Sequence, residues 1–85
     1  MSTHTPHELH DEFPQDAALL SRLKVDDAHF HNIAERYHEV NRAIHRIESE
    51  VEAASDEHAE ALKKQRLALL DEISGMLEKA RDAES

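Results

Sequence analysis

The sequence predicts an all-α protein built around an antiparallel hairpin of two helices, with a short helix before it. Two long stretches repeat apolar residues at alternating steps of three and four, which is the spacing of one amphipathic helix face. The 85 residues include one glycine and two prolines, so few positions break a helix. A strand with one buried face would instead alternate apolar and polar residues, and these stretches do not.

Residues 1–12 are expected to form a mobile tail. They combine small polar residues, Pro6, acids and histidines without the period of a helix or a strand. The histidines of this tail recur at steps of three: His4, His7 and His10.

A short helix is expected next, from about Gln15 to Lys24. Pro14 biases Phe13 away from helical backbone angles and itself suits an early helical position. The leucines of this helix share one face: Leu19, Leu20 and Leu23. We expect the helix to fold back over one end of the hairpin.

The second helix is predicted to begin at Asp26 or Asp27, because an aspartate carboxylate accepts hydrogen bonds from the free amides of a first turn. Its apolar face, here called the first seam, follows unbroken steps of three and four: Phe30, Ile33, Tyr37, Val40, Ile44, Ile47 and Val51. Seven apolar side chains along one narrow line indicate a helix that packs against another helix.

The third helix is predicted to begin at Ser55 or Asp56, either of which can cap it. Its face, the second seam, repeats the same spacing: Ala59, Leu62, Arg66, Leu69, Ile73, Met76 and Ala80, widened by Leu70 and Leu77. The two long helices are expected to match in length. Residues 13–80 then form a single helical-hairpin domain, and residues 81–85 a frayed C-terminus.

The connection between the two long helices leaves two alternatives. Residues 53–56 contain neither glycine nor proline, so one continuous helix from about Ala28 to Ala80 is the first of them. A continuous helix would carry the spacing of the first seam onto His58, whereas the second seam begins one residue later, at Ala59. This slip of one residue favours the second alternative, a turn at residues 53–56.

Several short motifs occur in order along the predicted helices. They are Phe13-Pro14, Leu20-Ser21-Arg22-Leu23-Lys24, Asp27-Ala28-His29-Phe30, Tyr37-His38-Glu39-Val40-Asn41, Ile44-His45-Arg46-Ile47-Glu48, Leu62-Lys63-Lys64-Gln65-Arg66-Leu67, Leu69, Asp71-Glu72-Ile73 and Met76-Leu77. In this order and spacing, over about residues 13–77, the chain resembles the YdcH-like family of small bacterial proteins. Ala28 and Asn41 stand where that family often has proline and aspartate. The resemblance implies a helical hairpin of bacterial, cytosolic origin, and because the family is a domain of unknown function it implies no catalytic or binding residue.

The composition argues against several kinds of site. With no cysteine, disulfides and thiolate metal sites are impossible, and one glycine is too few for a glycine-rich phosphate loop. The formal net charge of -9 opposes binding to nucleic acid or to an anionic membrane surface. No apolar run approaches the ~18 residues of a membrane span. The first residues carry no basic and apolar leader, so a soluble, cytoplasmic protein is expected.

No set of residues in the sequence predicts catalysis. A nucleophile, a base and donors for a developing negative charge cannot be assembled, and two rods enclose no apolar pocket for a substrate. We therefore expect a protein that is not an enzyme and that has no cofactor and no small-molecule substrate.

Eight histidines raise the hypotheses of a metal site and of a pH sensor. His31, His38 and His45 recur at steps of seven on the flank of the first seam. Neighbours in this row are separated by roughly 10.5 Å of helix rise, which is too far for one zinc ion with bonds of ~2.0–2.1 Å. We interpret them as seam-flanking or solvent-exposed histidines and expect no dedicated metal site, while a pH response stays open.

Lys63, Lys64 and Arg66 form the basic cluster of the sequence. Lys63 and Lys64 flank the second seam, where they can pair with acids of the partner helix, as flanking residues of coiled coils do. The candidate acids are Glu48, Glu50 and Glu52. Docking of another protein and binding of RNA are the alternatives for this cluster.

Arg66 interrupts an otherwise apolar seam. An unpaired buried guanidinium is costly, so its head must reach an acceptor or solvent while its methylenes cover the seam. The antiparallel register brings it near the middle of the second helix, where the candidate acceptors are Tyr37, Asn41 and Glu48. Such a polar contact can set helix register and partner number.

The leading functional hypothesis is a small cytosolic protein–protein interaction module that forms homo-oligomers. Two rods that meet along one seam leave apolar side chains open, and a two-fold dimer forming a four-helix bundle, or another protein, can bury them. The candidate interaction residues are Lys63, Lys64, Arg66, Leu67, Leu70 and Leu77. The alternative is an RNA- or ribosome-associated accessory factor that uses Lys63, Lys64 and Arg66.

Overall fold

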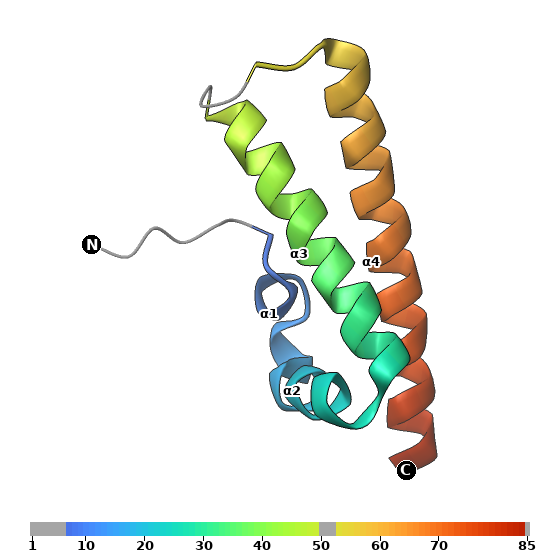
Figure 1. Ribbon diagram of the computed structural model, residues 1–85. Helices are drawn as coiled ribbons and strands as arrows, with labels where there is room; N and C mark the ends of the chain where they lie inside the picture. Colours follow the sequence, from blue (N-terminus) through green and yellow to red (C-terminus); the bar gives the residue numbers. More distant parts are fainter. Residues whose placement is uncertain (1–6, 50–52, 85) are drawn as a thin grey trace, which may run out of the picture.

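The computed structural model describes residues 7–49 and 53–84, and it is all-helical over these ranges. In chain order the elements are α1 (Leu9–Glu12), the 3-10 turn η1 (Pro14–Asp16), α2 (Ala17–Asp26), α3 (Ala28–Glu48) and α4 (Asp56–Glu84) (Figure 1). The predicted all-α class is confirmed, with no strand in the described residues. None of the helices in these ranges has the length and apolar character needed to cross a membrane.

Helices α3 and α4 lie side by side and run in opposite directions, as the predicted hairpin requires (Figure 1). Helix α3 ends at Glu48, and residues 53–55 are not helical before α4 begins at Asp56. The alternative of one continuous helix is therefore wrong. The last position of the first seam, Val51, lies outside the described residues.

Short polar side chains cap the two long helices. The Asp27 carboxylate accepts a hydrogen bond from the Phe30 amide at 3.1 Å, so Asp27 is the N-cap of α3. The Ser55 hydroxyl accepts one from the His58 amide, also at 3.1 Å, and begins α4. The Ser49 hydroxyl donates to the His45 carbonyl at 2.9 Å at the end of α3. The predicted starts at Asp27 and Ser55 are confirmed.

The two long helices differ in length, which corrects the expectation that they match. Helix α3 has 21 residues and α4 has 29, or about 32 Å against about 44 Å at 1.5 Å per residue. The C-terminal turns of α4 are held by side chains from the N-terminal part of the chain. Arg81 Nη1 donates to Asp16 Oδ2 at 2.6 Å, and Arg22 pairs with Glu84. Residues 81–84 are helical and belong to α4, which extends past the expected end of the hairpin at residue 80; residue 85 is not described.

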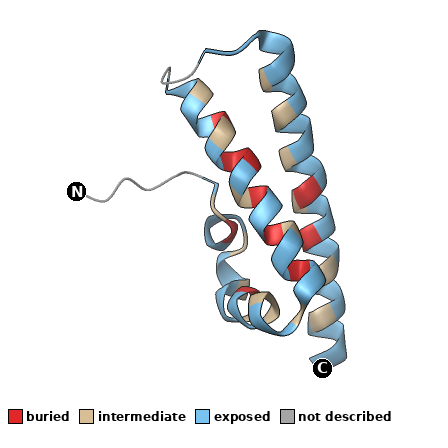
Figure 2. Ribbon diagram, in the orientation of Figure 1, coloured by how far each residue is buried: buried red, intermediate tan, exposed pale blue. Residues whose placement is uncertain are grey.

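The core consists of one apolar cluster shared by the four helices. Its buried members are Leu9, Leu20, Phe30, Ala34, Tyr37, Val40, Ile44, Leu69, Ile73 and Leu77 (Figure 2). Every described position of both predicted seams is buried or half-buried. The spacing of three and four therefore identified the inward faces of α3 and α4 correctly.

Helix α2 packs against α3 near the C-terminal end of α4 (Figure 1), so it covers one end of the hairpin as expected. The preceding segment corrects the expected extent of the tail. Leu9 lies in α1, is only 2% exposed and belongs to the core cluster. Burial of this leucine holds residues 9–12 in place. Residues 1–6 of the expected tail lie outside the described residues.

Candidate interaction surface

The outer face of α4 carries an exposed leucine with charged neighbours. Leu67 is 62% exposed, although the second seam on the same helix turns inward. Lys63 and Asp71 lie one helical turn to either side of it, and both are exposed. Leu67 is therefore an exposed apolar side chain with a charged residue one turn before it and another one turn after it. An apolar centre with a polar edge is the arrangement found in protein interfaces.

The six predicted interaction residues separate into three groups in the structure. Lys63, Lys64 and Leu67 are exposed, whereas Arg66 and Leu70 are half-buried. Leu77 is 0% exposed and lies in the core cluster, so it is not available to a partner. This corrects its assignment, because Leu77 lies on the buried side of α4, one turn after Ile73.

Arg66 reaches one of its three expected acceptors. Its Nη1 donates a hydrogen bond to the Asn41 side-chain oxygen across the hairpin at 3.2 Å. Asn41 is buried on α3, so the contact joins the inner faces of the two long helices. The expectation that Arg66 finds an acceptor in the middle of the second helix is confirmed.

The expected ion pairs of the neighbouring lysines are not found in the described part of the chain. Neither Lys63 nor Lys64 pairs with Glu48 there, and Glu50 and Glu52 lie outside the described residues. Because Arg66 turns inward to Asn41, the three basic side chains of the cluster do not share one face.

A double-mutant cycle should detect the coupling between Arg66 and Asn41. We expect Arg66→Leu and Asn41→Leu each to lower the free energy of unfolding, because a buried polar group loses a hydrogen bond. The double variant should lose less than the sum of the two, by about 0.5–2 kcal/mol. Urea denaturation of the four proteins measures this, and strictly additive losses would show that the contact contributes nothing.

A cluster of polar side chains joins the N-terminal segment and α2 to α3. His38 is half-buried; its Nδ1 lies 2.9 Å from Glu8 Oε2, and its Nε2 lies 3.4 Å from Lys24 Nζ. An ammonium group can only donate, so Nε2 accepts and Nδ1 carries the ring hydrogen that Glu8 receives. The geometry therefore fits a neutral His38 ring, which contacts Lys24 of α2 through Nε2 and Glu8 of the N-terminal segment through Nδ1.

The pKa of His38 is lowered from 6.5, chiefly because burial disfavours the charged ring. The Glu8 carboxylate opposes this effect and the Lys24 ammonium adds to it. A lowered pKa in the folded state means that His38 contributes stability above about pH 6.5, and that this contribution is lost as the pH falls through the folded pKa.

We expect the free energy of unfolding to fall more steeply between about pH 7 and pH 5 for the natural protein than for a His38→Gln variant. The matched control is His31→Gln, one heptad earlier on α3, where the side chain is exposed. Urea denaturation at each pH measures the difference. An identical pH dependence in the natural protein and His38→Gln would contradict the assignment.

Tyr37 lies beside this cluster with its ring in the core. Its hydroxyl donates to the backbone carbonyl of His7, so the side chain fixes the start of the described N-terminal segment. Burial, followed by the carboxylate of Glu12, raises the pKa of Tyr37 to about 12. A raised pKa contributes stability below pH 10, and this contribution is lost as the pH rises from 10 toward 12.

An alkaline titration can follow this tyrosine alone, since the chain has one tyrosine and no tryptophan. We expect the ultraviolet absorbance of phenolate to appear near pH 12 in the folded protein and near pH 10 in urea. A midpoint near pH 10 in both conditions would show that the tyrosine hydroxyl is not buried as described.

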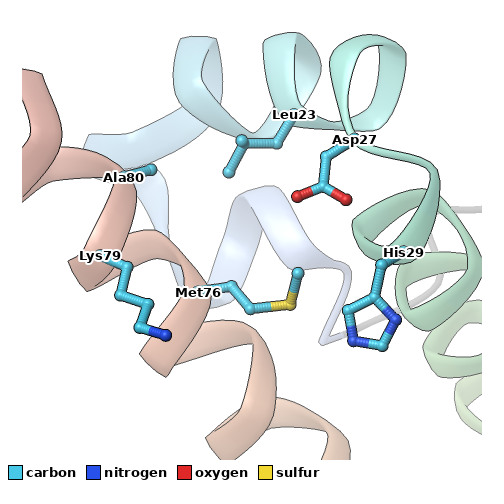
Figure 3. Close-up of a pocket in the computed structure, with 6 residues that line it drawn as sticks. All are labelled: Leu23, Asp27, His29, Met76, Lys79 and Ala80. Carbon is cyan, nitrogen blue, oxygen red and sulfur yellow. The ribbon is translucent and has the colours of Figure 1, made fainter.

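A pocket of about 460 Å³ lies between α4 and the junction of α2 with α3 (Figure 3). It is lined by Leu23, Asp27, His29, Met76, Lys79 and Ala80. Asp27 already accepts the Phe30 amide, and His29 Nε2 lies 3.8 Å from Glu72 Oε1. Two of its polar groups are thus engaged within the chain. Across the described residues, no three histidine or acidic side chains converge as a metal site.

These observations define a small protein made of a helical hairpin, with the helices α1 and α2 packed at one end. A family model described as "Protein of unknown function (DUF465)" matches residues 30–77, which is more than half of the chain. The protein belongs to this family, the YdcH-like family, and the resemblance noted in the sequence is confirmed. The match covers α3 from Phe30 onward and α4 as far as Leu77, and so includes the exposed Leu67 and its neighbours. Neither the curated proteins nor the solved structures give a match.

Proposed function

We propose that this protein is a small, non-catalytic cytoplasmic module for protein–protein interaction, and that it binds through the outer face of α4. The observation that carries the proposal is the exposure of Leu67, at 62%, on a helix whose other large apolar side chains are buried or half-buried. Burying this leucine against another protein would remove its apolar surface from water, at about 25 cal/mol per Å².

The distribution of basic side chains supports a protein partner over RNA. An RNA-binding surface gains affinity when several basic residues neutralise phosphates together. Here Arg66 is drawn into the hairpin by Asn41, which leaves Lys63 and Lys64 on the surface of a chain with a net charge of -9. Two lysines beside an exposed leucine fit the polar edge of a protein interface better than a surface that binds an RNA backbone.

Capture from a cell lysate tests the proposal. The natural protein, with a tag at its C-terminus, is cross-linked, recovered with and without nuclease treatment, and compared with a Leu67→Glu variant. We expect proteins that survive nuclease treatment and that Leu67→Glu loses. Partners that disappear with nuclease would support the RNA alternative.

The matched control is Val25→Glu, because Val25 is an apolar residue on α2 that is 84% exposed. This variant adds the same charge to a different exposed apolar position. It should retain the captured proteins. Equal loss in both variants would show that added charge, and not the α4 face, caused the effect.

A further inference from the structure

The outer face of α4 has opposite charges at equal distances from its exposed leucine. Lys63 lies four residues before Leu67 and Asp71 lies four residues after it, so the three share one side of the helix. Lys64 and half-buried Leu70 lie at three residues before and after. We call these five residues the outer stripe: Lys63, Lys64, Leu67, Leu70 and Asp71.

A two-fold axis through Leu67 would make this stripe complementary to itself. In a two-fold interface, if residue i of one copy faces residue j of the other, then j also faces i. For antiparallel helices that cross at Leu67, Lys63 of each copy faces Asp71 of the other. Lys64 of each copy faces Leu70, along which its methylenes can lie.

We propose that the partner of the outer stripe is a second copy of this chain, bound through an antiparallel crossing of the two α4 helices at Leu67. This assignment rests on the proposed function of the same face. Leu67 of one copy packs on Leu67 of the other, and two ion pairs between Lys63 and Asp71 flank the contact. A parallel pairing would place Lys63 against Lys63 and Asp71 against Asp71, which is repulsive.

The side chains that the pairing needs are accessible. Lys63, Lys64 and Asp71 are exposed, and none of them forms an ion pair within the described residues. The contact extends about one turn on either side of the crossing, so its area falls below the roughly 1,200 Å² of a stable interface. The net charge of -9 adds long-range repulsion between copies. The expected dimer is therefore weak and forms at roughly 0.1–1 mM protein.

Sedimentation velocity over this range tests the pairing with charge reversals of the full chain. Lys63→Glu and Asp71→Lys should each weaken self-association by roughly tenfold, because two attractive pairs become repulsive. The double variant Lys63→Glu/Asp71→Lys should restore it. An equimolar mixture of the two single variants should form a heterodimer, since all the introduced charges then meet opposite charges. Leu67→Glu should abolish association, and Val25→Glu should leave it unchanged.

Each contrary result overturns the assignment. A natural protein that stays monomeric at about 1 mM rejects self-pairing, and so does a dimer that ignores Leu67→Glu. A dimer that needs Leu67 but shows no recovery in the double variant or the mixture rejects the antiparallel register. Far-ultraviolet circular dichroism of each variant ensures that loss of association is not loss of folding. If the chain is monomeric while Leu67→Glu still loses partners from lysate, the proposed function stands and the second copy is excluded.

Discussion

Replacing Phe30 by alanine is expected to lower the free energy of unfolding by about 3–5 kcal/mol. Phe30 is fully buried in the first turn of α3, in the cluster that α2, α3 and α4 share. The truncation loses the free energy gained by burying the ring. It also leaves a cavity, which the packed helices around Phe30 can fill only in part. A domain of this size has a total stability of about 4–13 kcal/mol, so the substitution removes a large fraction of it.

Urea denaturation followed by circular dichroism measures this loss, with Val25→Ala as the control. Val25 is an exposed apolar residue, so its truncation should change stability by less than about 0.5 kcal/mol. If Phe30→Ala cost as little as this control, the end of the hairpin would not be packed as described.

Replacing Leu9 by alanine is expected to detach the N-terminal segment from the hairpin and to cost about 2–4 kcal/mol. Leu9 is the one buried residue of α1, and a helix of four residues has little stability of its own. A reading of this segment as a mobile tail predicts no effect from the same change. The substitution therefore separates the two descriptions.

The tyrosine titration gives a second measurement of detachment. When the segment leaves, the His7 carbonyl no longer accepts the Tyr37 hydroxyl, and the carboxylate of Glu12 moves away from the ring. The pKa of Tyr37 should then fall from about 12 toward its ordinary value of 10.0 in Leu9→Ala. An unchanged titration together with an unchanged stability would show that Leu9 does not hold the segment.

The hairpin could be predicted because its signal is repeated many times along the chain. Each turn of α3 and α4 adds one or two apolar residues at the same angle, so the direction of the buried face does not depend on any one position. The caps at Asp27 and Ser55 were also predictable, because capping depends on residues within one turn.

The N-terminal segment could not be predicted, for the opposite reason. Helix α1 offers a single apolar residue, Leu9, and a single residue has no period. Its burial depends on a surface that exists only after α2 and α3 have come together. The hydrogen bond between Tyr37 and His7 joins residues 30 positions apart, so no local sequence pattern predicts it.

The sequence also could not predict which leucines of the candidate surface are exposed. Leu67 and Leu77 are both leucines of α4 on or near the second seam. In the sequence they differ only in their angular position around the helix axis. The structure buries Leu77 and leaves Leu67 exposed. The arrangement of Lys63 and Asp71 about Leu67 was visible in the sequence, but it gained meaning only when Leu67 was found to face outward.

The buried contacts of α4 are concentrated toward its C-terminal end. The buried residues of α4 are Leu69, Ile73 and Leu77, from the middle of the helix toward its C-terminal end (Figure 2). Side chains of α2 and η1 contact its last turns through ion pairs with Arg81 and Glu84. Toward the connection with α3, the inward residues of α4 are half-buried. Local unfolding should therefore begin in the first turns of α4 and spread toward its C-terminal end. Backbone amides near Leu62 should exchange hydrogen for deuterium before those near Ile73.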